Sequence, residues 1–454
     1  MLTTGMVAID STILATAIPS IVADLGGFAQ FPWLFSIYLL AQAVTVPVYA
    51  KLSDVIGRKP VLLFGIGLFL LGSVLCGLAW NMPALILFRC LQGLGAGSVQ
   101  PMAVTIAGDI YTVAERAKVQ GYLASVWAVS AVAGPTLGGV FSQFLSWRWI
   151  FYVNVPVCLL AAWMLLRVFH EVIEHSRRRI DYTGAALLTV SLSLLILGVL
   201  EGGQAWAWDS PQSIGSFVAG GVLLGVFLIV ERRASDPVLP LWVLSRRLLL
   251  TTTLVALGAG AIVIGLTSYI PTYLEGTLGV APVVSGLSLA ALSIGWPLAA
   301  SLSGRLYLRI GFRHTVIVGT GTVVIGAALL SSFTFAPAIA LVTLSGFIVG
   351  LGLGFSATPS LIAAQASVPW NQRGVVTGMN QFARSMGSAL GVAVLGAIAN
   401  AVIASSGGQS APAIENASFG VFIAVVLIAL ATLAAALAMP RTPAKADAVE
   451  GTEA

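Results

Sequence analysis

The sequence predicts an all-helical membrane protein with fourteen transmembrane helices in a 6 + 2 + 6 arrangement. Three observations carry this prediction: the composition, the lengths of the apolar segments and an internal repeat. The 454-residue chain is 58% hydrophobic and 9% charged, with a mean hydropathy of +0.98. Soluble domains carry roughly 25% charged residues, so this composition indicates a chain that is embedded in lipid.

The apolar segments have the length that membrane helices need. A bilayer core about 30 Å thick requires ~20 apolar residues per helix. Several segments contain Pro or Gly, which membrane helices tolerate where neighbouring helices satisfy the freed backbone groups. We expect spans at residues 3–24, 33–52, 60–79, 83–108, 118–142, 148–168, 181–201, 214–231, 248–274, 281–304, 314–333, 337–366, 374–404 and 417–439.

The basic residues predict the orientation of these spans. With the N-terminus placed inside the cell, nineteen of the 22 Lys and Arg residues fall in cytoplasmic loops or the tail. Loops rich in Lys and Arg stay on the cytoplasmic side, and an error of one helix would invert every later loop. We therefore expect both termini to be cytoplasmic. The other three basic residues are Arg148 at an external edge and Arg89 and Arg384 inside spans.

The basic pI of about 9.3 does not indicate a nucleic-acid partner. The basic residues lie in short loops without interleaved aromatic residues, and attraction to anionic lipid explains them. The cysteines at 76, 90 and 158 lie within spans and lack disulfide or zinc spacing, so we expect no metal. We expect no cleavable signal peptide, because the first apolar segment lacks a basic n-region. The cytoplasmic N-terminus is either minimal or begins upstream of Met1.

The two halves of the chain repeat each other. The basic segment AKLSDVIGRK, at residues 50–59, returns 254 positions later as GRLYLRIGFR. Two membrane halves of this kind are typical of secondary transporters. The spans at 181–201 and 214–231 have no counterpart and are expected to be an insert. Further matches share an offset of 257, and they pair Gly93, Gly95 and Gly97 with Gly350, Gly352 and Gly354, Arg116 with Arg373, Gly121 with Gly378, and Gly134 with Gly391.

The repeat predicts the domain organisation. We expect an N-terminal six-helix bundle at residues 1–170 and a C-terminal six-helix bundle at residues 248–440. A two-helix insert with its cytoplasmic loops lies between them at residues 171–247. The polar segment at residues 441–454 is expected to be a disordered cytoplasmic tail.

Five motifs, in order along the chain, resemble those of the fourteen-helix drug:proton antiporters of the major facilitator superfamily. The resemblance covers nearly the whole chain. It departs from the family pattern at Ala50, where a glycine is usual, and at Val55, where an arginine is usual. The motifs are IDSTILATAIP at 9–19, AKLSDVIGRK at 50–59, LFRCLQGLGAGSVQP at 87–101, the antiporter motif of Gly134, Pro135, Gly138 and Gly139, and WRWIFYVNVP at 147–156.

The resemblance implies a multi-pass cell-membrane protein with the major facilitator fold. It implies multidrug efflux, in which proton entry drives export of small amphipathic or lipophilic compounds. The proton gradient is then the energy source, no cofactor is needed, and we expect a monomer in the lipid bilayer. The alternative is a dedicated transporter of one metabolite, lipid or siderophore. An enzyme is not expected, because the sequence has no nucleotide loop, metal-ligand spacing or catalytic triad.

Three charged residues lie inside spans. Charge at membrane depth is costly, so Asp10 is a candidate proton-coupling residue by default; the alternative is a structural hydrogen bond. The resemblance implies that Arg89 tunes Asp10 or relays its proton. At ~1.5 Å of rise per residue, however, their depths differ by roughly 12 Å, which leaves direct pairing open. Arg384 is either the nearer partner of Asp10 or the group that binds a substrate anion. The alternative for both Arg89 and Arg384 is that they bond only to helix backbones.

A conformational latch is implied at Asp54, Gly57, Arg58 and Lys59. A carboxylate near a helix N-terminus can accept from its free N–H groups. In the family this latch ties the two halves together on the cytoplasmic side. Plain positive-inside topology is the alternative, and it explains Arg58 and Lys59 but not Asp54. Leu308 replaces the aspartate in the second half, so one latch of this type is expected.

Two further groups of residues are candidates. In the antiporter motif, Gly134 removes a side chain and Pro135 removes a backbone donor, which predicts a local kink and tight packing. Other aromatic and amide residues lie on spans that line the cavity in this superfamily, where they suit flat lipophilic ligands or serve in packing. These are Tyr38, Gln42, Trp127, Tyr269, Tyr273, Asn380 and Gln381.

Overall fold

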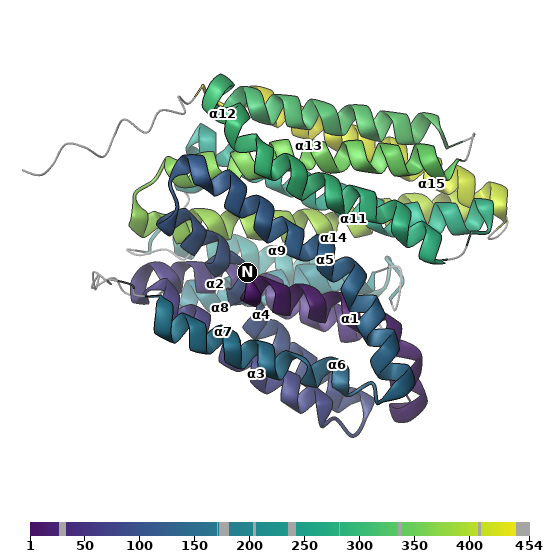
Figure 1. The fold of residues 1–454 in the computed structure, drawn as a ribbon, viewed down its shortest axis with the longest axis horizontal. Coiled ribbons are helices and arrows are strands. Elements are labelled where there is room, and N and C mark those ends of the chain that lie inside the picture. The colour runs from purple at the N-terminus through teal and green to yellow at the C-terminus, as the bar shows by residue number, and fades with distance from the viewer. Residues whose placement is uncertain are drawn as a thin grey trace, which may run out of the picture. The chain divides into compact units, whose positions relative to one another are not determined.

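The computed structural model describes residues 1–26, 33–169, 171, 181–202, 206–234, 242–280, 282–334, 338–406 and 410–441. These ranges are helical and contain no strand, with an isolated bridge between Gly202 and Trp206 (Figure 1). The helices are α1 (Leu2–Leu25), α2 (Trp33–Ile56), α3 (Arg58–Gly77), α4 (Met82–Ile110), α5 (Val113–Phe144), α6 (Trp149–Tyr152), α7 (Asn154–Val168), α8 (Tyr182–Glu201), α9 (Pro211–Glu231), α10 (Trp242–Ser245), α11 (Arg247–Leu278), α12 (Pro282–Ser332), α13 (Ile339–Ala366), the 3₁₀ helix η2 (Trp370–Gln372), α14 (Arg373–Ser405) and α15 (Ala411–Ala438).

The long helices overlap the predicted spans, but the span at 148–168 is divided into α6 and α7, and the short α10 lies outside any predicted span. Helix α12 contains two of these spans and changes direction at Gly311, where φ is 82°. Gly57, its repeat counterpart between α2 and α3, has a φ of 97°. A residue with a side chain rarely adopts this left-handed region, so glycine makes the same turn in both halves. The predicted disordered tail lies outside the described residues, apart from Arg441.

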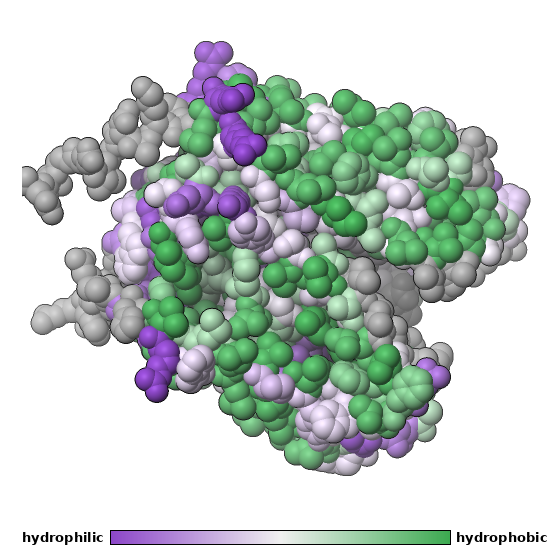
Figure 2. All heavy atoms as spheres, in the orientation of Figure 1, coloured by the Kyte–Doolittle hydropathy of each residue, from purple (hydrophilic) through white to green (hydrophobic). Residues whose placement is uncertain are grey.

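Most of these helices are suited to lipid. Within the described ranges, ten helices are long and apolar enough to cross a membrane, and two shorter apolar segments lie in α1 and α8. Figure 2 shows hydrophobic residues over most of the visible face. Helix α9 exposes Val218, Val222 and Ile229, as expected of a helix that faces lipid tails. The number of crossings and the side of each terminus remain predictions.

The chain forms two compact units. The first contains residues 1–106, 126–243 and 371–382, and the second contains the remainder. Each unit therefore includes a short segment of the opposite sequence repeat, 371–382 in the first and 107–125 in the second. The predicted division at residues 170, 247 and 440 stays a prediction.

Thr112 and Glu115 are hydrogen-bonded to each other at the start of helix α5. Glu115 accepts hydrogen bonds from the backbone N–H (3.1 Å) and the hydroxyl (2.8 Å) of Thr112. These bonds from Thr112 lower the pKa of the exposed Glu115 carboxyl. The next residue after Thr112, Val113, belongs to the second unit, as does Tyr307 of α12. The Tyr307 hydroxyl donates to the Val113 carbonyl. The start of α5 is thereby joined to α12.

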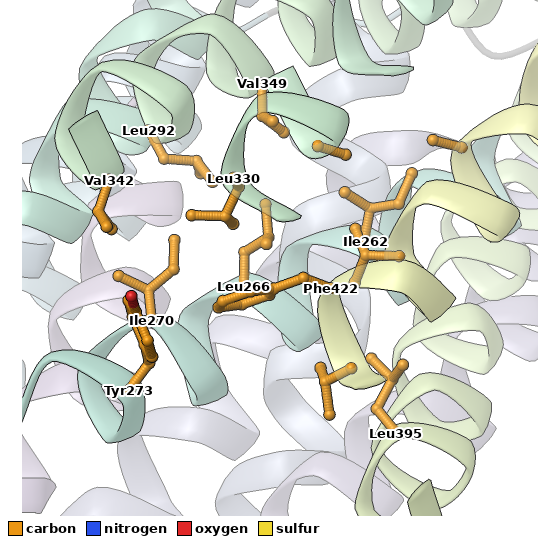
Figure 3. Packing of buried hydrophobic residues seen from close by; sticks show 14 of the residues in the cluster. Ile262, Leu266, Ile270, Tyr273, Leu292, Leu330, Val342, Val349, Leu395 and Phe422 are labelled. Atoms are coloured by element: carbon orange, nitrogen blue, oxygen red, sulfur yellow. The ribbon is translucent and has the colours of Figure 1, made fainter. Parts of the chain in front are cut away.

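Each unit has its own apolar core. In the second unit, Leu266, Ile270 and Tyr273 of α11 pack with Leu330 of α12 and Phe422 of α15 (Figure 3).

In the first unit, α1 contributes to two buried clusters. Met6 and Val7 belong to one cluster, whereas Ile13 and Leu14 belong to the other. Asp10 lies between these two pairs in the sequence, and it is itself 1% exposed. The fold thus places a single carboxylate among apolar side chains.

Candidate functional site

The carboxylate of Asp10 forms a buried ion pair with Arg89. Arg89 Nη1 lies 2.7 Å from Asp10 Oδ2, and both side chains are 1% exposed. The direct pairing that the depth estimate from helix rise left open is thus present, since a long arginine side chain can reach across a difference in depth. Arg89 Nε also donates to the Leu34 carbonyl at 3.2 Å, which fixes the guanidinium between α1, α2 and α4.

Two amides complete the shell around Asp10, and sequence reasoning missed both. Asp10 Oδ1 accepts from Gln92 Nε2 at 2.8 Å and from Asn154 Nδ2 at 3.1 Å. Gln92 lies three residues after Arg89 on α4, so both side chains share one helix face. That spacing is a signal in the sequence, as is the isolated polar Asn154 at the start of α7.

A serine of α3 ties the two amides together. Ser73 Oγ accepts from Gln92 Nε2 at 3.2 Å and from Asn154 Nδ2 at 3.0 Å. Its own proton goes to the Phe151 carbonyl at 2.9 Å. Four helices, α1, α3, α4 and α7, therefore meet in one buried hydrogen-bonded network, which we call the Asp10 network (Asp10, Ser73, Arg89, Gln92 and Asn154).

An aromatic ring covers the arginine. The guanidinium carbon of Arg89 lies 4.1 Å from the centre of the Tyr38 ring, which is a cation–π geometry. Tyr38 is 1% exposed. The structure thus places this predicted cavity residue against the Asp10 network, and its contact with a substrate stays a prediction.

Asp54 lies at the N-terminus of α14. Its carboxylate accepts from the backbone N–H groups of Gly374 at 3.1 Å and Val375 at 2.8 Å. Residues 371–382 belong to the first compact unit, so this contact lies within one unit while joining the two sequence repeats. The first N–H groups of a helix lack partners and carry partial positive charge, which suits a carboxylate.

Arg58 completes this site from the first turn of α3. Arg58 Nη2 lies 2.9 Å from Asp54 Oδ1, and Arg58 Nη1 donates to the Ser53 carbonyl at 3.1 Å. Both partners of the ion pair are buried. A methyl group on Gly378 would overlap the side chain of Ala50, so α14 approaches α2 closely here. The role of these residues as a conformational latch stays a prediction.

A second carboxylate, absent from the sequence prediction, caps α3. Glu171 accepts from the backbone N–H groups of Arg58 and Lys59, both at 2.8 Å. The Lys59 ammonium donates to the carbonyls of Phe169 at 2.6 Å and Leu166 at 3.2 Å. The segment that follows α7 is therefore fastened to the start of α3.

The antiporter motif packs against α1. A methyl group on Gly134 would overlap the Thr12 side chain and lie 3.1 Å from the Ile13 nitrogen. The Thr12 hydroxyl donates to the Ser130 carbonyl at 2.9 Å. Gly138 is buried, and Gly139 faces open space. The tight contact thus lies two residues after Asp10, whereas the Pro135 side chain is outside the described part.

The other predicted residues do not join the Asp10 network. The Tyr273 hydroxyl donates to the Thr334 carbonyl at 2.6 Å, and its ring packs edge-on against Phe422, which is the placement of a packing residue. Arg384 is partly buried on α14 and has no ion pair with a described carboxylate. The remaining members are partly buried (Gln42, Trp127 and Tyr269) or buried (Asn380 and Gln381).

Comparisons with solved structures support the fold. The human organic anion transporter MFSD10 (TETRAN) has a TM-score of 0.64 at 16% identity, covering 94% of this chain and 98% of its own. The proton:xylose symporter XylE has a TM-score of 0.65 at 13% identity, covering 94% and 92%. At these identities the likeness shows the fold alone.

Curated relatives are closer in sequence. Multidrug resistance protein 3 of Bacillus subtilis (strain 168) is 36% identical, covering 87% of this chain and 77% of the relative. The multidrug transporter protein MdtP of the same organism is 34% identical, covering 88% and 75%. The efflux pump FUS6 of Gibberella fujikuroi is 30% identical, covering 92% and 76%.

A family profile described as Major Facilitator Superfamily matches residues 1–392. That match spans most of the chain and includes the Asp10 network, Asp54 and the antiporter motif. Taken with these relatives, it shows that the chain belongs to the Major Facilitator Superfamily and is a multi-pass membrane transporter, not an enzyme.

Proposed function

We propose that this transporter exports small amphipathic compounds in exchange for protons by alternating access. The observation that carries the proposal is the buried ion pair of Asp10 and Arg89 within membrane spans. The names of the relatives, multidrug transporters and efflux pumps, support export of many compounds.

Proton uptake at Asp10 would change the balance of charge in a dry site. Removing one charge of a buried pair leaves the other uncompensated, which typically costs about 3–5 kcal/mol. A neutral Asp10 would therefore leave the Arg89 guanidinium without its counter-charge, beside the uncharged carbonyl oxygens of Gln92 and Leu34. Such a penalty favours a rearrangement of α1 against α4. Binding of a proton at Asp10 would in this way be coupled to a conformational change.

The contact of Asp54 with α14 is a candidate for the element that switches. Carboxylates at helix N-termini contribute about 0.3–1 kcal/mol when exposed and up to ~2 kcal/mol when partly buried. A contact of this size can be broken and remade in each cycle, because a population shift needs only a few kcal/mol. We propose that it is formed in one transport state and released in the other.

The proton gradient is sufficient for the proposed exchange. A membrane potential of 100 mV provides ~2.3 kcal/mol per charge, and one pH unit adds about 1.4 kcal/mol. Together these would sustain a substrate gradient of several hundred-fold per proton, since each ~1.4 kcal/mol is a factor of ten.

The test is proton movement driven by substrate in proteoliposomes. The native chain and Asp10→Asn would be compared under an imposed pH gradient, with neutral, cationic and anionic lipophilic dyes as probes. We expect the native protein alone to move protons when a dye is added. If Asp10→Asn couples as well as the native chain, the proton site is elsewhere. Response to a single compound class would instead favour a dedicated transporter.

A further inference from the structure

Every group that contacts the Asp10 carboxylate is a hydrogen-bond donor. Among the described residues, its partners are Nη1 of Arg89, Nε2 of Gln92 and Nδ2 of Asn154. The arginine cannot be deprotonated in proteins, so it can never accept. The question is whether either amide could turn its oxygen toward Asp10 instead.

Neighbouring groups with one possible role fix the orientation of both amides. The Phe151 carbonyl can only accept, so the Ser73 hydroxyl must donate to it. Ser73 Oγ can then only accept, and Asn154 must present its NH₂ group to Ser73. The same NH₂ group reaches Asp10 Oδ1 at 3.1 Å.

The amide of Gln92 is fixed in the same manner. Arg89 Nη1 donates to Gln92 Oε1 at 2.7 Å, so the Gln92 NH₂ group is left to face Asp10 and Ser73. In this arrangement no described acceptor faces Asp10. The three bonds use three of the roughly four lone-pair sites of the carboxylate, so a proton on the remaining site would have no acceptor among the described residues, which favours the ionised form.

The surroundings contain few other titratable groups. Among the described residues, those close enough for the charge of Asp10 to act on them are Tyr38 on α2, Cys76 on α3, Arg89 on α4 and Cys158 on α7. Helix α5 contacts α1 through Thr12 and Gly134, which do not titrate. Helix α7 therefore acts on the ionised carboxylate of Asp10 through a hydrogen bond from the uncharged amide of Asn154.

We infer that Asn154 is a positioning residue for the proton site, which stabilises the ionised form of Asp10 over the neutral form. This inference rests on the proposed proton coupling at Asp10. Asn154 is the first residue of α7 and follows α6, which ends at Tyr152. A change at this junction would therefore be felt directly by the carboxylate.

The test is an infrared titration of Asp10 in proteoliposomes, which needs no substrate. The carboxyl C=O band of Asp10 is the one that is absent in Asp10→Asn. Asn154→Leu removes the donor at nearly constant volume, and loss of a hydrogen bond to the charged form favours the neutral form. We expect its midpoint to move to higher pH by about one unit, a tenfold change in proton affinity.

Asn154→Asp provides a second arm that preserves size. Two carboxylates that share a site cannot both ionise easily, so we expect a larger shift to higher pH. The matched control is Thr105→Val on α4, which loses a buried bond to the Pro101 carbonyl (2.8 Å) without touching Asp10. We expect the control to titrate as the native protein does.

The outcomes separate this inference from the proposed function. If the native protein has a titrating band that Asp10→Asn removes, but Asn154→Leu titrates at the native midpoint, Asn154 has only a structural role. If the native protein has no such band, proton coupling at Asp10 fails, and the inference fails with it. Should Asn154→Leu not fold, Asn154→Ala, which also lacks the donor, decides in its place.

Discussion

Glu171 accepts a hydrogen bond from the backbone N–H of Lys59 at 2.8 Å, and this joins the segment after α7 to the first turn of α3. The same carboxylate accepts from Arg58, whose guanidinium pairs with Asp54. Asp54 in turn accepts from Gly374 and Val375 at the start of α14. Two carboxylates at two helix N-termini are thus connected through one arginine, within a single compact unit.

Removing the charge of Glu171 should loosen this chain of contacts. We expect Glu171→Gln to destabilise the protein by about 0.3–1 kcal/mol, because the first turn of α3 loses a carboxylate. We also expect a changed transport rate, since Arg58 is positioned by the same turn. Thermal unfolding and dye transport measure the two effects.

The control is Asp181→Asn, because Asp181 caps α8 by accepting from the Gly184 N–H at 2.8 Å. It should lower stability by a similar amount and leave the transport rate at the native value. Equal transport rates for the two variants would show that Glu171 is an ordinary cap.

Added bulk between α2 and α14 should slow transport. A methyl group on Gly378 would overlap the Ala50 side chain, so α14 would have to move away from α2 close to Asp54. We expect Gly378→Ala to lower stability by about 1–3 kcal/mol, as overpacked sites do, and to slow dye transport. The double variant Ala50→Gly and Gly378→Ala restores the space and should recover part of both losses, whereas transport by Gly378→Ala at the native rate would contradict a role of this close approach in the cycle.

Breaking the Asp10–Arg89 pair from one side should cost more than removing both charges. Arg89→Gln leaves a buried carboxylate without its cation, for which we expect a loss of about 3–5 kcal/mol. The double variant Asp10→Asn and Arg89→Gln leaves no charge in the Asp10 network and should be more stable than Arg89→Gln alone. Denaturant unfolding in detergent measures this non-additivity, and strictly additive losses would show that the two charges act independently.

Much of the helical architecture was predictable because it depends on local sequence. Apolar length sets the approximate helix boundaries, and the repeat aligns Gly57 with Gly311, which the structure shows to be turn residues of positive φ. The composition of the Asp10 network was less accessible. Ser73 and Asn154 are 81 residues apart in the sequence, and only the packing of α3 against α7 shows that they meet. Glu171 was missed for the same reason, since its partners lie 112 and 113 residues away.

The antiporter motif offers a matched pair of glycines for the last prediction. A methyl group on Gly134 would overlap Thr12, two residues after Asp10, whereas a methyl group on Gly139 would meet nothing within 4 Å. We expect Gly134→Ala to push α5 away from α1, to lower stability by about 1–3 kcal/mol as overpacked sites do, and to slow transport at least tenfold. Gly139→Ala should match the native protein in both respects, because alanine is the better helix former.

Thr12→Ala removes the hydroxyl that the added methyl meets, so the double variant with Gly134→Ala should recover part of the lost stability. Equal behaviour of the two alanine variants in thermal unfolding and dye transport would show that the contact between α1 and α5 has no part in the cycle.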